Sequence, residues 1–342
     1  MKMSNLETAA QLRAYCARIG ADPLLVQGAG GNASWKDGGT LWVKASGTWL
    51  ADAEINDIFV PADLTHLRRA ITNSNYSVTP KVVGSSNGRP SIETLLHALM
   101  PHKVVVHLHA VEILAHLVRE NPIEDFKKLI GDSIKWVCVD YFKPGADLAE
   151  AVAEQLATQP DVDVVFLRSH GLVIGGEDVE RIESTLCQLL SLLKNRTLPP
   201  STDIESATPD STFQIGGYVP CGDKEVNQLA IKDEFVSRLQ TEWALYPDQV
   251  VFLGGEAAII GRSFELSDLD KVSETNPPYV FSIGKGVYES LTISAAQKAQ
   301  LRCYYDVLVR QEVAGKLTSL NNDQIASLLS WDAERYRKIA ST

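Results

Sequence analysis

The chain has 342 residues, of which 45% are hydrophobic and 22% are charged, and its formal net charge is -11. This composition is typical of a soluble protein with more than one domain, because a single domain usually holds roughly 100–200 residues. The acidic balance argues against a nucleic-acid surface, which needs clustered Lys and Arg. No signal peptide or bilayer-spanning apolar stretch is evident, so we expect a cytoplasmic protein without a membrane partner.

The five cysteines are scattered along the chain and form no CxxC pair. An odd number with this spacing indicates neither a disulfide framework nor a thiolate metal site. The cysteine pattern is therefore the one expected in a reducing cytoplasm.

The composition changes at residues 197–212, TLPPSTDIESATPDST, where prolines and small polar residues interrupt the apolar periodicity. We therefore predict a first domain at 1–197, a linker at 198–212 and a second α/β domain at 213–342, whose role stays open. All seven histidines precede the linker. Any imidazole chemistry must belong to the first domain.

In the first domain the predicted helices and strands alternate along the chain. Helical periodicity predicts helices at 6–20, 91–100, 112–120, 147–159 and 178–195. Apolar runs and alternation predict strands at 23–27, 33–37, 40–47, 104–110, 135–141 and 163–176. The expected fold class is α/β, with a central sheet flanked by helices.

The second domain is expected to be a smaller α/β unit. Its patterns predict helices at 225–243, 293–313 and 322–339, and strands at 249–255 and 278–284. The stretch VVFLGGEAAIIGR echoes VVFLRSHGLVIGG of the first domain, with Glu256 at the place of His170. A strand followed by glycine is so common in α/β chains that it explains this echo better than a partial duplication, by about three to one.

The predicted strand VVVHLHA carries two histidines separated by one leucine. His107 and His109 should point to the same face, because side chains alternate along a strand. A single buried histidine is more often a hydrogen-bonded core residue, by about two to one, but a same-face pair presents two nitrogen ligands to one point. His170 is the best third ligand, since it follows an apolar strand and precedes a glycine that lets the backbone turn sharply. Three histidines with an open position describe a catalytic metal site, and the other four are structural by default: His66, His97, His102 and His116.

Glu93 and His97 lie four residues apart on the predicted helix 91–100 and so share one face. A carboxylate beside a divalent cation is suited to carry a proton, and an ordinary solvated glutamate is about equally common at this spacing. Ser91 suits the N-cap of this helix, whose free N–H groups could also hold an anion.

The stretch GAGGNAS, Gly28 to Ser34, formally satisfies the dinucleotide-binding pattern G-x-G-x-x-A. The residues that follow predict a hairpin rather than the helix that must carry the pyrophosphate, so we exclude a dinucleotide fold. Glycine turns can still cradle an anion, and donors lie nearby; a pair of tight turns without a ligand is about equally frequent. The candidate donors on this part of the chain are Asn32, Lys44, Ser46 and Gly47.

Four stretches taken in order, GAGGNAS, LWVKASG, RPSIETLLHALMPHKVVVHLHA and LRSHGLVIGG, resemble the class II aldolase/adducin family over residues 8–195. Within that family the chain most resembles the aldolase part of bifunctional rhamnulose-1-phosphate aldolase/alcohol dehydrogenase proteins. Residues 213–342 resemble the segment that follows the aldolase part in those proteins, and no dehydrogenase domain is expected in this chain.

The resemblance implies a central sheet covered by helices and a homo-oligomer, usually a tetramer, with active sites between subunits. It implies a divalent metal, commonly Zn²⁺ but also Mn²⁺ or Co²⁺, held by histidines that match His107, His109 and His170. Glu93 matches the family's acid/base carboxylate. Tyr141 matches a tyrosine that donates a proton from a neighbouring subunit in the fuculose-phosphate members, and a packed tyrosine at a strand end is an equal alternative.

The function implied by the resemblance is that of a metal-dependent aldolase, a carbon–carbon lyase. It would cleave a ketose 1-phosphate to dihydroxyacetone phosphate and an aldehyde through a metal-bound enediolate, to which Glu93 would return a proton. Phosphate-binding members carry hydroxyl residues where this chain has Ala29 and Ile92, so the sugar and its phosphorylation stay open. The residues expected to bind this sugar phosphate are Gly31, Asn32, Lys44, Ser46, Gly47 and Ser91.

Two alternatives remain for this site. Sugar-phosphate 4-epimerases and a thioribulose-phosphate dehydratase share the three-histidine site, so they compete with the aldolase for the reaction. A non-catalytic adducin-like assembly module is the third reading. The presence of all three histidines together with Glu93 speaks against it, because a purely structural module has no physical need for that set.

Overall fold

The structure is a computed structural model of the chain, and it describes residues 5–86, 88–195, 215–262, 272, 274–312 and 315–333. The chain divides into two compact units. Unit 1 comprises the residues up to Lys194 together with a short stretch from Trp331, and unit 2 comprises residues 195–330. The predicted linker at 198–212 lies outside the described residues.

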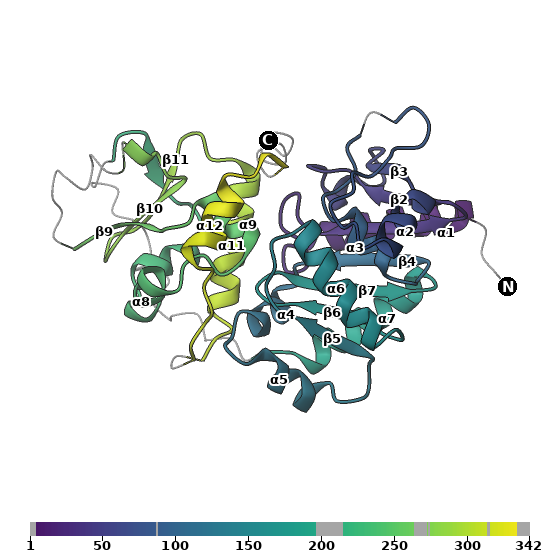
Figure 1. Cartoon of the computed structure of the whole chain (residues 1–342). Helices are drawn as coiled ribbons and strands as arrows, with labels where there is room; N and C mark the ends of the chain where they lie inside the picture. The colour runs from purple at the N-terminus through teal and green to yellow at the C-terminus, as the bar shows by residue number, and fades with distance from the viewer. Residues whose placement is uncertain are drawn as a thin grey trace. The chain divides into compact units, whose positions relative to one another are not determined.

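Unit 1 is built on a seven-stranded mixed sheet with the strand order β3-β2-β1-β4-β7-β6-β5 (Figure 1). Neighbouring strands are antiparallel except β5 and β6, which are parallel. The predicted hairpin at 33–47 is confirmed, with Trp35 opposite Trp42. The strands are β1 (Asn32–Asp37), β2 (Thr40–Lys44), β3 (Phe59–Asp63), β4 (Val104–Leu108), β5 (Trp136–Val139), β6 (Val164–Leu167) and β7 (Gly171–Gly176).

Helices cover both faces of this sheet. One face packs against α1 (Asn5–Gly20), α4 (Val111–Leu117), α5 (Pro122–Leu129) and α7 (Val179–Leu192). The other face packs against α2 (Leu64–Thr72), α3 (Thr94–Leu99) and α6 (Ala146–Thr158). The alternation along β4 sorts its side chains between the two cores, since Val104 and Val106 lie in the first and Val105 in the second. The expected helix-flanked sheet is therefore confirmed, and His107 shares the face that α3 and α6 cover.

Two local expectations for unit 1 were wrong. Residues 23–27 form turns rather than a strand, because Asp22 accepts backbone hydrogen bonds from Leu25 and Val26. Residues 163–176 form two antiparallel strands, β6 and β7, instead of one. The turn between them contains Ser169 at φ +50°, and serine gives no sequence signal for such a turn. The elements β3, α2 and α5 were not predicted.

Unit 2 contains a four-stranded sheet with the order β8-β11-β10-β9. Its strands are β8 (Tyr218–Pro220), β9 (Ala258–Ile260), β10 (Tyr279–Ser282) and β11 (Gly286–Ser290). Its helices are the short 3₁₀ helix η3 (Val226–Ala230), α8 (Asp233–Thr241), α9 (Pro247–Leu253), α11 (Ala295–Leu308) and α12 (Asn322–Leu329). In the part of the chain that the structure describes, no helix is long and apolar enough to span a membrane.

The strand predicted at 249–255 was wrong, because this stretch is helix α9. Pro247 occupies the first helical turn, and every residue of α9 is buried, so the apolar run shows no helical period. The predicted helix at 225–243 is divided into η3 and α8. The sequence echo between the two units therefore joins a helix in one to a strand in the other, which argues against a duplication.

Candidate metal centre

Three histidine side chains of unit 1 converge at the end of β4. His107 belongs to β4, His109 directly follows it, and His170 lies in the turn between β6 and β7. This turn lies beside the end of β4, because Leu172 of β7 pairs with Leu108 of β4. One nitrogen of each ring lies within 4.8 Å of the other two, and all three residues are buried. The predicted histidines therefore form a cluster that could hold a metal ion.

The hydrogen bonding of His107 fits a metal ligand. Its Nδ1 lies 2.9 Å from the carbonyl oxygen of Leu172 and donates a hydrogen bond to it. In the neutral ring the proton is therefore on Nδ1, and Nε2 keeps a lone pair that can bind a metal. This Nε2 lies 3.1 Å from Nε2 of His109. Two nitrogens bound to a tetrahedral zinc at about 2.0–2.1 Å lie about 3.3 Å apart. The spacing of the two rings therefore suits a shared divalent cation.

The Glu93 carboxylate lies beside these rings. Its Oε1 is 3.6 Å from Nε2 of His107 and 3.4 Å from Nε2 of His170. Glu93 is only 8% exposed, and Oε1 accepts no hydrogen bond from any described residue. A buried carboxylate oxygen without a donor is costly, and a cation or a protonated substrate group would meet that need. The structure thus brings Glu93 together with all three predicted histidines.

Glu93 is held at the start of α3 rather than within it. The helix begins at Thr94, Glu93 is its N-cap residue, and the expected capping role of Ser91 is wrong. Ser91 instead forms the preceding turn, in which its carbonyl accepts from Thr94 N–H and its Oγ accepts from Glu93 N–H at 3.2 Å. This turn fixes the backbone of Glu93, and so it fixes the position from which the Glu93 side chain extends.

Polar side chains of β1 form hydrogen bonds with α3 and the residues that follow it. Asn32, Ser34 and Lys36 alternate with apolar residues, and we call these three the polar stripe. Asn32 is paired with His107 in the sheet, and its Nδ2 donates to no described residue although Asn32 is 1% exposed. Ser34 Oγ lies 2.8 Å from Nδ1 of His97, a fully buried residue of α3. The stripe therefore runs from the histidine cluster along α3.

Lys36 completes this stripe at the far end of α3. Its ammonium donates to the carbonyl oxygens of Met100 and His102, the latter at 2.8 Å. A cation at the carbonyl end of a helix is electrostatically favourable. Burial, with a smaller contribution from Arg68, lowers the pKa of Lys36 to about 7. Hydrogen bonds thus replace apolar packing where α3 crosses β1.

The predicted anion-binding residues lie on two adjoining loops. Gly31 has φ +65°, and a Cβ there would lie 3.1 Å from the carbonyl oxygen of His107, so glycine is needed for the close approach. Lys44 is 2% exposed and donates to the carbonyl oxygens of Ala29 at 3.2 Å and Thr48 at 2.7 Å. The main role that the structure shows for Lys44 is thus to join the glycine loop to the loop after β2.

The remaining predicted donors lie on that second loop and on the segment beside it. Ser46 N–H donates to the carbonyl of Arg89, and Ser91 N–H donates to the carbonyl of Lys44. Gly47 has φ +81°, which favours glycine at this turn. The Ser46 side chain is partly exposed, whereas Ser91 is buried. Their role in phosphate binding stays a prediction.

Tyr141 lies several strands away from the histidine cluster of its own chain. It follows β5, the edge strand, which is separated from β4 by β6 and β7. Three strand spacings amount to roughly 14 Å. Burial raises the pKa of Tyr141 to about 12, and its hydroxyl has no hydrogen-bond partner among the described residues. The arrangement is compatible with a role in a neighbouring subunit, which stays a prediction.

The glycine after His170 has a different role from the expected one. The sharp turn is made by Ser169, while a Cβ on Gly171 would lie 2.3 Å from the carbonyl oxygen of Leu108 and 3.1 Å from Cδ2 of His109. Gly171 is therefore required by the close approach of β7 to the end of β4. The sequence analysis found this glycine but assigned it the wrong cause, and it missed Ser34 and Lys36, whose alternation on β1 was the available signal.

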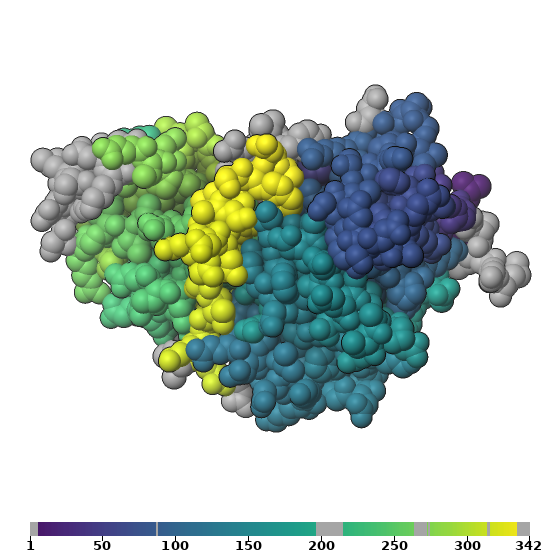
Figure 2. All heavy atoms as spheres, viewed as in Figure 1, coloured from purple at the N-terminus to yellow at the C-terminus, as the bar shows by residue number. Residues whose placement is uncertain are grey.

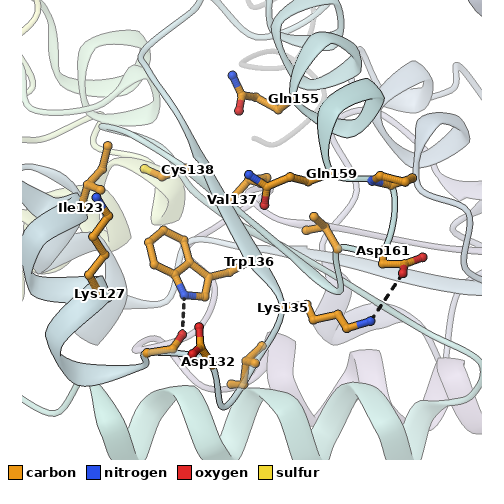
Figure 3. Close-up of a pocket in the computed structure, with 14 residues that line it drawn as sticks. Ile123, Lys127, Asp132, Lys135, Trp136, Val137, Cys138, Gln155, Gln159 and Asp161 are labelled. Atoms are coloured by element: carbon orange, nitrogen blue, oxygen red, sulfur yellow. Dashed lines mark hydrogen bonds and ion pairs between the residues drawn. The ribbon is translucent and has the colours of Figure 1, made fainter.

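A separate hollow of about 990 Å³ lies along the edge strand β5 (Figure 3). It runs between α5 and the end of α6, and its lining includes Lys127, Trp136 and Gln155. Nε1 of Trp136 donates to the carbonyl oxygen of Gly131 at 3.2 Å. No predicted catalytic or metal-binding residue lines this hollow, so it is distinct from the candidate metal centre.

A mixed sheet with helices on both faces and three buried imidazoles beside a carboxylate defines an α/β protein with a candidate metal centre. The chain belongs to the class II aldolase and adducin N-terminal domain family, whose sequence model matches residues 10–186. This match contains all three histidines and Glu93. It leaves unit 2 outside the family domain.

Similar proteins were found among curated sequences and solved structures. The curated relative "Uncharacterized oxidoreductase YuxG" of Bacillus subtilis (strain 168) is 32% identical over 178 residues, which cover 47% of this chain and 25% of that protein. The match thus spans about a quarter of its length. Solved structures include the N-terminal class II aldolase domain of a Thermoplasma acidophilum protein, at 27% identity, covering 56% of this chain and 92% of that chain, with a TM-score of 0.45. A sugar-phosphate aldolase from Thermotoga maritima is 19% identical, covers 56% of this chain and 98% of that chain, and has a TM-score of 0.41.

Proposed function

We propose that unit 1 is a divalent-metal-dependent aldolase that cleaves a ketose 1-phosphate to dihydroxyacetone phosphate and an aldehyde. The observation that carries this proposal is the convergence of three buried imidazoles with Oε1 of Glu93, at 3.4 and 3.6 Å from two of them. Membership of the class II aldolase family supports metal-assisted carbon–carbon chemistry at this cluster. The sequence resemblance that we infer to the aldolase part of bifunctional rhamnulose-1-phosphate aldolase/alcohol dehydrogenase proteins makes rhamnulose 1-phosphate the first substrate to test.

His107, His109 and His170 are the proposed ligands, and the donor set fits zinc, with manganese or cobalt as alternatives. When bound, such a cation withdraws electron density from the oxygen atoms of the substrate carbonyl and its neighbouring hydroxyl. The carbonyl of Leu172 fixes the tautomer and the ring orientation of His107. The protein thereby presents ligand nitrogens whose positions are set before substrate arrives.

Glu93 is the proposed proton carrier. Cleavage leaves negative charge on a substrate carbon, and the Glu93 carboxyl group would deliver a proton to that carbon. In the reverse direction the carboxylate would remove the same proton from dihydroxyacetone phosphate. The Ser91 turn and the polar stripe support this role, because they fix the backbone of Glu93 and the helix that follows it. In that reverse direction, Tyr141 of a neighbouring subunit in a homo-oligomer, with a tetramer favoured, would protonate the aldehyde oxygen.

The substrate phosphate is proposed to bind the two loops next to the cluster. Asn32 offers an amide N–H₂ group that has no acceptor among the described residues. Gly31, Ser46, Gly47 and Ser91 line the same region, and the buried charge of Lys44 favours an anion nearby. A sugar phosphate fits this donor set.

Other activities are outcomes of the test. The same residues would serve a sugar-phosphate epimerase or dehydratase, and a module without activity would bind no substrate. The curated relative carries the name of an oxidoreductase, but the match covers a quarter of it. We therefore propose no oxidoreductase activity for this chain.

The test measures cleavage of ketose 1-phosphates, including rhamnulose and fuculose 1-phosphate, by coupling released dihydroxyacetone phosphate to a reductase. Cleavage should require the divalent metal and should fall by about 10²–10⁴-fold in Glu93→Gln. Glu124→Gln, which alters an exposed carboxylate on α5, is the matched control and should be unchanged. Metal-loaded protein that cleaves none of these sugars would contradict the proposal.

A further inference from the structure

A hollow of about 440 Å³ lies within unit 2, bounded by α11, the ends of β10 and β11, and the loop after β8. Figure 1 locates α11, β10 and β11 in this unit. The hollow combines charged groups with an apolar lining, as small-molecule sites commonly do. None of the groups proposed for the aldolase reaction belongs to it.

Opposite charges meet in pairs across this hollow. Nζ of Lys298 lies 2.8 Å from Oε1 of Glu289, and Nη1 of Arg302 lies 3.2 Å from Oδ2 of Asp223. Lys298 and Arg302 are four residues apart, so both leave the same face of α11. The helix therefore supplies two cations, and the sheet and the loop supply two carboxylates.

The two ion pairs differ in how firmly they are held. Arg302 also binds Asp306 through two nitrogens, at 3.0 and 3.1 Å, and Glu225 at 2.7 Å. Three carboxylates thus fix its guanidinium in place, and Arg302 acts as a wall of the hollow. Lys298 binds Glu289 through one carboxylate oxygen, and its ammonium carries three N–H donors. The Lys298–Glu289 pair is therefore the one that can accept a further charged group.

Exposure separates the two partners of that pair. The Lys298 side chain is 52% exposed, whereas the Glu289 side chain is 14% exposed. The lysine has a flexible stem that can turn toward a ligand, while the glutamate is held against the sheet. A ligand can thus bind between them without a change in the backbone.

The rest of the lining is apolar. Val226 and Leu301 are buried residues that line the hollow, and the buried Tyr279 adds an aromatic ring. Burial beside Cys221 and two carboxylates raises the pKa of Tyr279 above its ordinary value, so its phenol stays protonated at neutral pH. An aliphatic group bound here would leave water for an apolar surface.

We propose that this hollow binds a small zwitterion with the chemistry of an α-amino acid that has an aliphatic side chain. Its ammonium group binds Glu289, its carboxylate binds Lys298, and its side chain lies against Val226 and Leu301. A lone cation would leave Lys298 without its counter-charge, and a lone anion would do the same to Glu289. A zwitterion supplies both charges, and the site goes beyond the function proposed for unit 1.

The test uses isothermal titration calorimetry on the full chain with the twenty amino acids, among which L-leucine is the matched probe. We expect L-leucine or another aliphatic amino acid to bind. 3-Methylbutylamine, which lacks the carboxylate, and 4-methylpentanoate, which lacks the ammonium, should each bind about 10-fold to 100-fold more weakly.

Variants connect the binding to the hollow. Glu289→Gln and Lys298→Met should each weaken binding by about 10-fold to 100-fold, while Lys298→Arg keeps most of it. Asp233→Asn, which breaks an exposed ion pair with Arg262 elsewhere in unit 2, is the control and should bind like the wild type. The proposal is overturned if no amino acid binds up to about 10 mM. Equal binding of either single-charge analogue, or unchanged binding in both loss-of-charge variants, would overturn it as well.

Discussion

The two units arrange their charged and titratable groups in different ways. In unit 1 the histidine cluster, Glu93 and the polar stripe all lie around one strand end and the helix above it. In unit 2 the charged groups are bound to one another along α11, as in the three carboxylates around Arg302. Polar groups that are satisfied internally stabilise a fold, whereas groups left with unmet donors and acceptors, such as Glu93 and Asn32, need an additional partner.

His107→Ala should have the largest effect, because it removes a proposed ligand whose orientation is fixed by the carbonyl of Leu172. We expect metal affinity to fall by more than about 100-fold, since changes to groups that merely support a ligand already cost about 10–100-fold. Metal content of purified protein, measured by elemental analysis, tests this expectation. His66→Gln on α2 is the control and should retain full metal occupancy. A His107 variant that also retained full metal occupancy would contradict the proposed metal site, and with it the contrast between the two units.

Gly171→Ala should have the next largest effect. The new Cβ would lie 2.3 Å from the carbonyl oxygen of Leu108, so β7 and β4 must separate beside His109. Overpacking of this kind costs about 3 kcal/mol and should also loosen the metal site. Denaturant unfolding and metal titration on the same variant measure both effects. Gly39→Ala is a control for glycine replacement, because a Cβ there would make only an ordinary contact, with Thr65 Oγ1 at 3.5 Å.

Lys36 should make the stability of unit 1 depend on pH. Its pKa is about 7 in the fold and near 10.5 when unfolded, so the unfolded chain binds more protons between these values. The free energy of unfolding should therefore rise with pH from about 7 to about 10.5, because unfolding takes up a proton throughout this range. Below pH 7 the cost of burying the charge is present in full. In Lys36→Met, the free energy of unfolding measured by urea denaturation should no longer rise over this pH range. If it rises as in the wild type, groups other than Lys36 cause the pH dependence.

Arg302→Gln should have the smallest effect and should be confined to unit 2. The guanidinium is partly exposed, so solvent screens its ion pairs, and we expect a loss of about 1 kcal/mol. Thermal unfolding should reveal the loss, while metal content stays at the wild-type level. A fall in metal content would show that the two units do not act separately.

The histidine cluster could be predicted because its residues follow simple periodicities. Alternation along 104–110 was enough to place His107 and His109 together, and an apolar strand before His170 indicated where a third ligand would lie. Helical spacing had already indicated Glu93 as a possible proton carrier, and the resemblance to known aldolases matched it to the family's acid/base carboxylate. What could not be predicted depends on contacts distant in sequence, such as the hydrogen bonds from Lys36 to the carbonyls after α3.

The wrong expectations have physical causes of the same kind. Helix α9 is buried on all sides, so its seven residues show the apolar run of a strand. Ser169 makes a turn that the sequence gives no reason to expect, because a non-glycine residue seldom adopts positive φ. Burial on every side and local backbone strain both depend on the completed fold. Neither produces a periodic pattern of apolar residues that the sequence would show.

The hairpin of β6 and β7 has a consequence for which cations the cluster can accept. His107 lies on β4 and His170 lies in the turn that leads into β7. The backbone ladder between these two strands therefore sets the distance between the two residues, and the strands approach each other closely at Gly171. A bound ion must therefore adapt to the spacing of the ligands, because the ligands cannot follow the ion. For the proposed metal site, we therefore expect this fixed spacing to favour small tetrahedral ions over Ca²⁺, which needs six to eight oxygen ligands at longer distances.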